Sequence, residues 1–433
     1  MREQRKKLVL VVASLMLIIP SPGLCADEVA PGDVIDKGNW EKAEGLLPPS
    51  VLEWVKKGEY VIKVGQLNYD QKEFFAPWVG ESFQANVGKY DVDEKGQLVE
   101  AATRKPPSSI VGIPFPDNRP DDPKVCLKAL YNKSYHGLCY GNFVYPFDIT
   151  WVGRSGFERE VAMVFANAVM DGYPGAQELS NPERTLRLSL YAVLSPYDIK
   201  GTAILLWRYK GDKQDVNFTY LPAIRRVRRM TPANRSDALV GCDAAIDDAW
   251  GFDAKENSFE WQFLRTQEAL VPFASTEPEV IVQNENGEWH TTPEVTPITY
   301  GYQASDWKGA PWAGVNWTWV KRTVWVIKGK PKDPYYNYGF DELWYDPDIY
   351  FPKYLIIYDR SGAYWKTFTA GHGGFQSADQ KMRYIQVTFQ HMVDDRFDHC
   401  SIIEHMSKRN MWVHFAHVNL NDFTLAGFQK FCK

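Results

Sequence analysis

The sequence predicts an α+β protein, mainly β, in which a strongly curved antiparallel sheet packs on inserted helices. Segments rich in β-branched and aromatic residues alternate with turn signals through the centre and the C-terminal half, which is typical of successive antiparallel hairpins. Helix signals fall between groups of strands rather than after each strand, which favours helices packed against a sheet. The 16 Trp, 23 Tyr and 23 Phe among 433 residues supply apolar area for a large sheet face or a cavity wall. A chain of this length buries a sizeable core, as one large β domain or as two domains.

Residues 1–26 have the layout of a cleavable secretory signal peptide. Four basic residues, Arg2, Arg5, Lys6 and Lys7, precede an apolar run over residues 8–19, which is too short to span a membrane comfortably. We expect cleavage near Ala26 and export of the chain to the periplasm, where it could associate with the outer membrane. No later segment approaches the ~20 apolar residues of a membrane-spanning helix, so we do not expect an integral membrane protein. Cleavage moves the formal net charge from −5 to about −8, which does not favour nucleic-acid binding.

The N-terminal part of the mature chain, residues 27–150, is expected to consist mainly of helices and loops. Pro48 and Pro49 precede an apolar face of Val51, Leu52, Trp54 and Val55, which predicts a helix. Residues 60–67 alternate as a strand does. A second helix is predicted after Asp122, which would cap it, with Pro123 in its first turn.

The main β part is expected over residues 151–433, and a subdivision near residues 255–310 is an option. The predicted strands cover residues 185–194, 199–209, 216–230, 315–327, 353–358, 363–370, 384–392 and 411–418. Asp359-Arg360-Ser361-Gly362 is a hairpin signal. Asn421 is expected to cap a terminal helix through Phe431. In the long strand near residue 320, the period-two rule places Trp317, Trp319, Thr323, Trp325 and Ile327 on one face.

Five cysteines remain after cleavage, and an oxidising compartment permits disulfides between them. Proximity in the sequence favours a bridge between Cys126 and Cys139 and another between Cys400 and Cys432. Cys242 is then the unpaired thiol.

One segment, residues 218–248, joins a strand-like run, a Leu221-Pro222 step, two arginine pairs, a turn at Gly241 and Asp243, and paired acids. This pattern resembles the bacterial family called domain of unknown function 1329 (DUF1329), which is related to the periplasmic lipoprotein-sorting LolA/LolB-like superfamily. A second block is similar to the N-terminal signature of that family: Gly112-Ile113-Pro114-Phe115-Pro116, then Asp122-Pro123, then Ala129-Leu130-Tyr131-Asn132. The resemblance implies that residues 27–433 form a LolA/LolB-like domain of the lipid-carrier type. The implied fold is an incomplete β-barrel with helices closing its open side and an apolar cavity between them.

The arginines of this segment are candidate ligand or partner contacts. By alternation, Arg225 and Arg229 share one strand face, and Arg226 and Arg228 share the other. Guanidinium groups bind phosphate or carboxylate in a forked geometry, so either pair could meet an anionic headgroup or an acidic partner. The alternative is a solvated strand edge whose charge prevents aggregation.

The acids Asp243, Asp247 and Asp248 could pair with those arginines or bind a cation. A turn followed by a capped helix is the more common use of such a cluster, and we treat Pro222, Gly241 and the three acids as a structural motif.

The aromatic stripe of Trp317, Trp319 and Trp325 could line a lipid cavity, stack on sugar rings or form plain core. A C-terminal run of His, Asp, Glu and Cys between residues 391 and 417 has metal-ligand types, but its spacing does not bring them together on one strand face, so no metal site is predicted. Nucleotide-binding, nucleophile-elbow and zinc-protease motifs are not found, so no catalytic residue and no cofactor is assigned.

We therefore predict a periplasmic, non-catalytic carrier or chaperone of a lipid, an acyl chain or another apolar ligand. Its partner, by analogy with the family, could be an inner-membrane exporter or an outer-membrane protein. The alternative function is binding or cleavage of an envelope polysaccharide, with aromatic rings as stacking platforms and carboxylates as acid and base.

Overall fold

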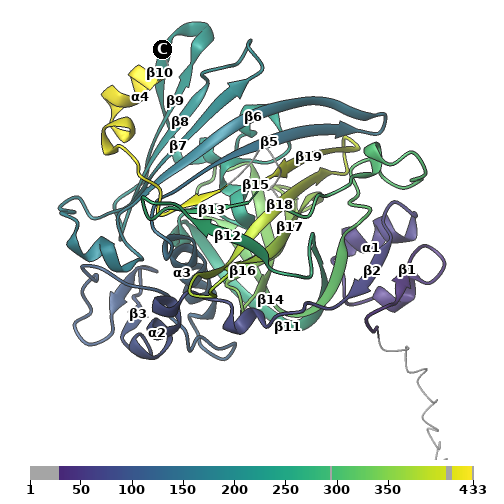
Figure 1. The fold of residues 1–433 in the computed structure, drawn as a ribbon, viewed down its shortest axis with the longest axis horizontal. Helices are drawn as coiled ribbons and strands as arrows, with labels where there is room; N and C mark the ends of the chain where they lie inside the picture. Colours follow the sequence, from purple (N-terminus) through teal and green to yellow (C-terminus); the bar gives the residue numbers. More distant parts are fainter. Residues whose placement is uncertain (1–28, 293–294, 406–411, 432–433) are drawn as a thin grey trace, which may run out of the picture.

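A single curved sheet of 18 strands, open at both edges, dominates the computed structural model, which describes residues 29–292, 295–405 and 412–431. Its strands fall into two groups, which we call the first and second wings (Figure 1). The first wing consists of β5 (Phe143–Gly153), β6 (Gly156–Val169), β7 (Thr185–Ser195), β8 (Ala203–Tyr209), β9 (Val216–Leu221) and β10 (Arg226–Met230). The mainly β, strongly curved antiparallel fold predicted from the sequence is confirmed.

The second wing follows the same antiparallel pattern. It consists of β11 (Phe259–Phe273), β14 (Thr318–Pro331), β15 (Tyr338–Asp346), β16 (Phe351–Asp359), β17 (Tyr364–Ser377), β18 (Arg383–Asp394) and β19 (His399–Glu404). The wings join where β19 pairs with β5, from His399 opposite Gly153 to Glu404 opposite Asp148. The free edges of this continuous antiparallel path are β10 in the first wing and β11 in the second.

Shorter strands extend this framework. Within the sheet, β12 (Glu279–Gln283), β13 (Trp289–Thr291) and β20 (Val413–His414) link β17 to β5, while β1 (Val34–Ile35) and β2 (Ile62–Gly65) extend from β14. A separate hairpin contains β3 (Tyr90–Val92) and β4 (Leu98–Glu100). Residues 255–310 thus contribute three strands to the same sheet as the rest of the chain.

Within the described residues, four α-helices cover the sheet: α1 (Pro49–Lys56), α2 (Pro77–Ala85), α3 (Val125–Leu138) and α4 (Leu425–Phe431). The carboxylate of Asp122 accepts the N–H of Lys124 at 2.7 Å just before α3 begins. The side chain of Asn132 in α3 binds both the N–H and the C=O of Phe115, at 2.8 and 2.7 Å. Two parts of the N-terminal signature are therefore bonded to each other. No helix in the described ranges combines the length and apolar character needed to cross a membrane.

The core has three parts. The largest lies between the concave face of the sheet, α2 and α3, and the second lies around α1, β2 and the start of β14. The third lies on the opposite face of the first wing, where Phe423 and Phe428 at the C-terminal end cover small residues of β6 to β8. Helices thus pack on both faces of the first wing, and the concave face is filled rather than open.

Several predicted elements differ from the structure. The strand expected over residues 216–230 is a hairpin, because Pro222 starts a 3-10 turn and Arg225 adopts a left-handed conformation with φ of 50° before β10 begins. The terminal helix begins at Leu425, where the hydroxyl of Thr424 accepts the N–H of Gly427 at 3.0 Å, and Asn421 lies in the preceding 3-10 turn. Part of the strand predicted over residues 411–418 is β20, and Met411 lies outside the described residues.

The predicted bridge between Cys126 and Cys139 is wrong. Both cysteines are free thiols near opposite ends of α3, which places them roughly 20 Å apart along the helix axis. A disulfide requires Cα atoms within about 7 Å. Cys242 and Cys400 are also free and buried. Because Cys400 forms no disulfide, the predicted bridge between Cys400 and Cys432 is wrong as well. The predicted signal peptide lies outside the described residues, so cleavage near Ala26 stays a prediction.

Candidate functional site

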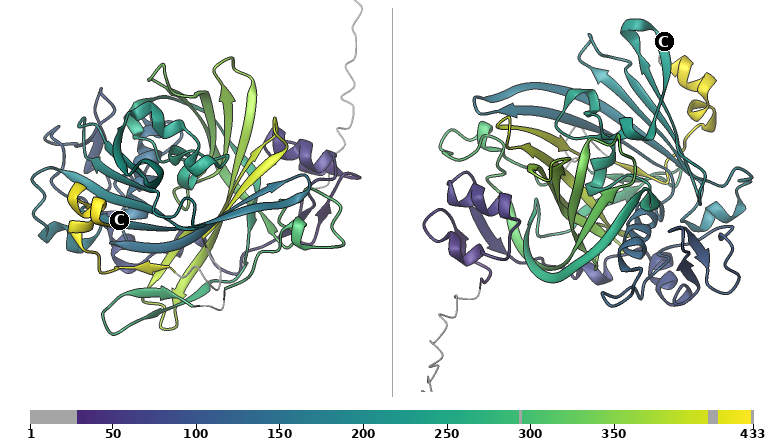
Figure 2. Two further views of the ribbon diagram at one scale, coloured as in Figure 1. Left: turned by 90° about the horizontal axis from the view of Figure 1, so that it is seen from above. Right: turned by 180° about the vertical axis from the view of Figure 1, so that it is seen from behind.

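The chain between the two free edges of the sheet, residues 231–258, forms what we call the crossing segment. It leaves β10, runs through the concave interior and continues into β11, and its coils lie between the strands of the two wings (Figure 2). Short 3-10 turns make up its regular structure: η5 (Pro232–Ser236), η6 (Leu239–Gly241), η7 (Ile246–Gly251) and η8 (Glu256–Ser258). Buried apolar residues and buried acids follow one another along this segment. The segment is therefore in contact with the rest of the protein along most of its length, unlike an amphipathic helix that buries one face.

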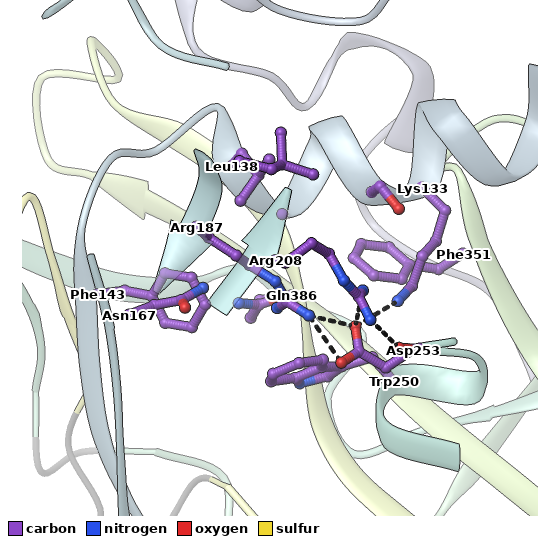
Figure 3. Close-up of a pocket in the computed structure, with 13 residues that line it drawn as sticks. Lys133, Leu138, Phe143, Asn167, Arg187, Arg208, Trp250, Asp253, Phe351 and Gln386 are labelled. Carbon is purple, nitrogen blue, oxygen red and sulfur yellow. Dashed lines mark hydrogen bonds and ion pairs between the residues drawn. The ribbon is translucent and has the colours of Figure 1, made fainter. Parts of the chain in front are cut away.

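A buried group of charges anchors the crossing segment to the first wing. Arg187 of β7 and Arg208 of β8 lie directly opposite each other in the sheet register. Two like charges in such a position destabilise a sheet unless an anion lies between them. Asp253 of the crossing segment is that anion: both of its oxygens lie 2.7 Å from Arg187 Nη2, and Oδ1 lies 3.3 Å from Arg208 Nη1 (Figure 3).

Two further cations surround the same carboxylate. Arg235 of η5 donates to the backbone C=O of Asp253 at 2.7 Å, and Lys133 Nζ of α3 lies 4.0 Å from its Oδ1. Burial alone would raise the pKa of Asp253, but Arg187 and Arg208 outweigh that effect and hold the pKa well below its usual range. Burial lowers the pKa of Lys133 to about 8, against the opposing pull of Asp253. Asp253 is therefore a buried anion that bonds together α3, two strands and the crossing segment.

A cavity of about 40 Å³ adjoins this charge cluster. We call it the cationic cavity, because Lys133, Arg187 and Arg208 line it against the single carboxylate of Asp253. The rest of its wall is largely apolar and includes Leu138, Phe143, Leu186, Trp250 and Phe351. Asn167 also lines it and is fully buried, and its Nδ2 has no hydrogen-bond partner among the described residues. The cavity thus offers cations and an unused donor within an apolar surrounding.

A second cavity of about 30 Å³, which we call the apolar cavity, also has Trp250 in its wall. Its wall includes Tyr145, Phe147, Tyr191, Leu239, Ala244, Ala245, Trp250, Phe368 and Ile403. Trp250 is the aromatic residue shared by both walls. Its φ of 52° is a left-handed value that bulky residues rarely adopt, and its indole N–H lacks a partner in the described part of the chain. Such strain persists only where the surroundings enforce it, here through the bond from its backbone N–H to Gln390 Oε1 at 2.6 Å.

The predicted motif acids form hydrogen bonds and ion pairs within the protein. Asp248 accepts the N–H of Ala245 at 2.7 Å and the hydroxyl of Tyr338 at 2.8 Å. Asp247 binds Arg235 and the hydroxyl of Tyr336, so its arginine is not one of the predicted four. Burial raises the pKa of both Asp247 and Asp248, while Arg235 and Lys366 respectively oppose that effect.

The rest of the motif also holds the crossing segment in place. Asp243 accepts hydrogen bonds from Ser401 at 2.6 Å and from the ring of His399 at 2.7 Å. Gly241 adopts a φ of 82°, and its carbonyl accepts the indole N–H of Trp151 in β5 at 3.1 Å. Pro222 starts the turn between β9 and β10. Asp243 and Gly241 therefore bond the crossing segment to β19 and β5, where the wings join.

None of the four predicted arginines lines either cavity of this interior site. Arg225, Arg226, Arg228 and Arg229 are all exposed, and none forms an ion pair with a described residue. Val227 packs on the third part of the core, which contains Phe423 and Phe428, and Met230 packs on the largest part. Alternation therefore puts Arg226 and Arg228 on the concave side and Arg229 on the opposite side. The predicted pairing of Arg225 with Arg229 is wrong, because Arg225 belongs to the turn. A role in binding stays a prediction.

The three predicted tryptophans are core residues that line neither cavity. Trp317 stacks on Phe389 with ring centroids 4.5 Å apart, and it contacts Trp319. Trp325 packs instead against Tyr345, with centroids 6.0 Å apart, and lies in a different part of the core. The single stripe is split because a 14-residue strand such as β14 extends about 46 Å and passes from one core to the next.

The C-terminal histidines do not gather around a metal. No group of three or more potential ligands is found in residues 29–292, 295–405 and 412–431. His391, His405 and His414 are buried separately, and burial lowers the pKa of each to about 3.

The residues that make up the interior site were missed in the sequence. The available signal was a basic residue inside an otherwise apolar strand or helix: Arg187 between Leu186 and Leu188, Arg208 between Trp207 and Tyr209, and Lys133 in α3. Such positions are buried only when a partner anion exists, and Asp253 is remote from all three in the chain.

The model of the family described as "Protein of unknown function (DUF1329)" matches residues 34–429. The chain belongs to the DUF1329 family. No curated protein matches the sequence of this DUF1329 member.

Several solved structures resemble it. A domain described as an outer membrane lipoprotein-sorting protein from Vibrio parahaemolyticus is 16% identical, with 70% of this chain and 97% of that chain covered and a TM-score of 0.46. A DUF1329 family protein from Desulfovibrio piger is 12% identical, covering 69% and 95%, with a TM-score of 0.45. A LolA superfamily protein from Nitrosomonas europaea is 13% identical, covering 70% and 98%, with a TM-score of 0.40.

Proposed function

We propose that this DUF1329 protein is a non-catalytic carrier of an amphipathic molecule with an apolar chain and an anionic group. The supporting observation is that Trp250 lines both the cationic cavity and the apolar cavity. A fatty acid or a phospholipid has the same two-part chemistry. The chain would occupy the space beside Leu239, Phe368 and Ile403, and the anionic group would face Lys133 and Arg187.

The charges of the cationic cavity suit an anion. Three cations and one carboxylate line it, and Asp215, outside the wall, lies 2.9 Å from Arg208 and balances part of the positive charge. Asn167 Nδ2 adds a donor that is otherwise unused. Hydrogen bonds from cations to carboxylate or phosphate are among the strongest in proteins, and a buried site strengthens them further.

Carriage requires the crossing segment to move. A water molecule occupies roughly 10–15 Å³ on this measure, so cavities of about 40 and 30 Å³ hold a few waters and not an acyl chain. Displacement of Trp250 would join the two cavities, and its strained backbone lowers the cost of that displacement. Each CH₂ group buried from water then contributes about 0.8 kcal/mol, enough for reversible extraction of a lipid.

Location and partners follow from the sequence pattern rather than from the site. The N-terminal signal pattern supports a periplasmic carrier, associated with the outer membrane or free. A partner would be an inner-membrane exporter that delivers the molecule or an outer-membrane protein that accepts it.

The first test is binding of cis-parinaric acid, a fluorescent fatty acid, to the mature chain, together with native mass spectrometry of lipid that co-purifies from the periplasm. The parent should bind the probe. Trp250→Ala should bind it about tenfold more tightly, because the joined cavity accommodates roughly two more CH₂ groups. Trp261→Ala removes the same side chain outside both cavities and should leave affinity unchanged. Equal affinity of parent and Trp250→Ala would contradict the proposed chain site.

The second test concerns the anionic group. Lys133→Met keeps an unbranched side chain, one atom shorter, and removes its charge, so cis-parinaric acid should bind about tenfold more weakly through loss of a charge-assisted hydrogen bond. The methyl ester of the same probe has no charge and should bind parent and variant alike. If the parent binds neither probe but retains an envelope glycan, the polysaccharide function replaces the carrier function.

A further inference from the structure

Two neighbouring turns at one end of the first wing expose apolar side chains among basic residues. The turn between β7 and β8 and the turn between β9 and β10 lie at the same end, because Ala203 pairs with Tyr220 where β8 begins and β9 ends. Both lie at the upper end of these strands in Figure 1. We call residues 194–202 and 222–230 the rim.

The rim is unusually apolar for a pair of exposed turns. Tyr197 is 93% exposed, and Leu194 and Ile224 are each 43% exposed. Their exposure is not explained by a place in a cavity wall, because none of the three side chains lines either cavity of the interior site. Exposed apolar residues grouped in this way mark a contact surface.

The rim is also strongly basic in an acidic protein. It contains Lys200, Arg225, Arg226, Arg228 and Arg229 and a single acid, Asp198, whereas the whole chain has a net charge of −5. The four arginines have no ion-pair partner among the described residues. Their charge is therefore available to an external anion.

We propose that the rim docks the protein on the surface of a membrane that contains anionic phospholipid. Tyrosine and aliphatic side chains at turn tips enter the headgroup region, and arginines around them bind the phosphates. An acidic protein surface would complement the charge but gives no reason for Tyr197 and Ile224 to project at adjacent tips. The purpose of docking rests on the proposed carrier function, because a carrier must meet the membrane from which it takes a lipid.

The geometry connects the rim to the interior site. Arg226 and Arg228 lie on the concave side of β10 with Met230, which packs on the main core. β10 connects the turn of the rim to the crossing segment, which begins after Met230 at the end of β10 away from that turn.

The test is sedimentation of the mature chain with vesicles of phosphatidylcholine alone or with an equal amount of phosphatidylglycerol. The parent should bind only the anionic vesicles, and added salt should weaken binding. The triple variant Arg225→Gln, Arg226→Gln, Arg228→Gln should bind about 100-fold more weakly, since each basic residue near such a surface contributes about fivefold. Lys37→Gln, Lys308→Gln, Lys330→Gln makes the same change of net charge at exposed sites elsewhere and should bind as the parent does.

A reporter at the tip adds a second readout. The emission of Ile224→Trp should shift to shorter wavelength on anionic vesicles and be quenched by brominated lipid. Lack of parent binding to anionic vesicles, equal loss in both triple variants, or a tip tryptophan that stays in water would each overturn the proposal. The arginine variant should still bind cis-parinaric acid in solution. Vesicle binding without fatty-acid binding would leave docking in place and remove the carrier function.

Discussion

Replacement of Asp253 with asparagine is expected to lower the free energy of unfolding by about 3–5 kcal/mol, the cost of leaving buried charge unpaired. Arg187 would lose its carboxylate partner, Arg208 would retain only Asp215, and Lys133 would lose its nearest carboxylate. Asparagine keeps the shape of the side chain, so the decrease in the free energy of unfolding measures the effect of the charge rather than of packing. Urea unfolding followed by tryptophan fluorescence measures it as a lower midpoint.

A matched control is Asp306→Asn, which removes the same charge from an exposed position and should change stability by less than about 0.5 kcal/mol. Asp253→Asn combined with Arg187→Met should recover part of the loss, because the double variant has fewer unpaired cations. A midpoint for Asp253→Asn within error of the parent would show that the crossing segment is not held by this charge cluster.

The folded protein is also expected to lose stability steeply as the pH falls from 6.5 to 5.5. Burial lowers the pKa of His136, His391, His405 and His414 to about 3, and holds that of His372 well below its usual value. In the unfolded chain these rings titrate near about 6.5. Above that pH both states are neutral and no stability is lost, whereas below it only the unfolded chain takes up protons.

Each buried ring then costs about 1 kcal/mol at pH 5.5, so five together cost on the order of 5 kcal/mol, comparable with the total stability of many proteins. Urea unfolding at both pH values measures this. In His391→Phe, the ring that contacts Trp317 cannot titrate, and the slope of stability against pH should fall by the equivalent of one proton. Equal stability at pH 6.5 and 5.5 would contradict the prediction, because it would require the buried rings to be charged in the folded state.

Local chemistry was predictable from the sequence. The first helix follows from Pro48 and Pro49 with the spacing of apolar residues after them. The hairpin at Asp359 follows because its carboxylate accepts the N–H groups of Ser361 and Ala363, at 2.9 and 3.0 Å. Both depend on residues a few positions apart, and so did the resemblance to the DUF1329 family.

Features that depend on strand register were not predictable. Arg187 and Arg208 become neighbours only when β7 and β8 pair in one register, and Asp253 joins them only because the chain turns back through the interior. The break after Leu221 was hidden because alternating arginines continue the strand pattern past Pro222. Cys126 and Cys139 were paired on proximity in the sequence, but a helix between two residues holds them apart.

The pairing of β5 with β19 has a consequence for how the chain assembles. β5 is the first strand of the first wing, and its partner is the last strand of the second wing, so residues 154–398 must emerge before the two can meet. Because residues 154–398 separate the two strands in the chain, loop closure is slow and leaves this edge of β5 without its partner until the second wing has formed. The first wing, α3 and the crossing segment can fold in that interval, because Asp253 follows its cationic partners in the chain. The edge of β5 is therefore the strand edge most exposed to pairing with another molecule during folding, and it is where a chaperone would protect the nascent protein most effectively.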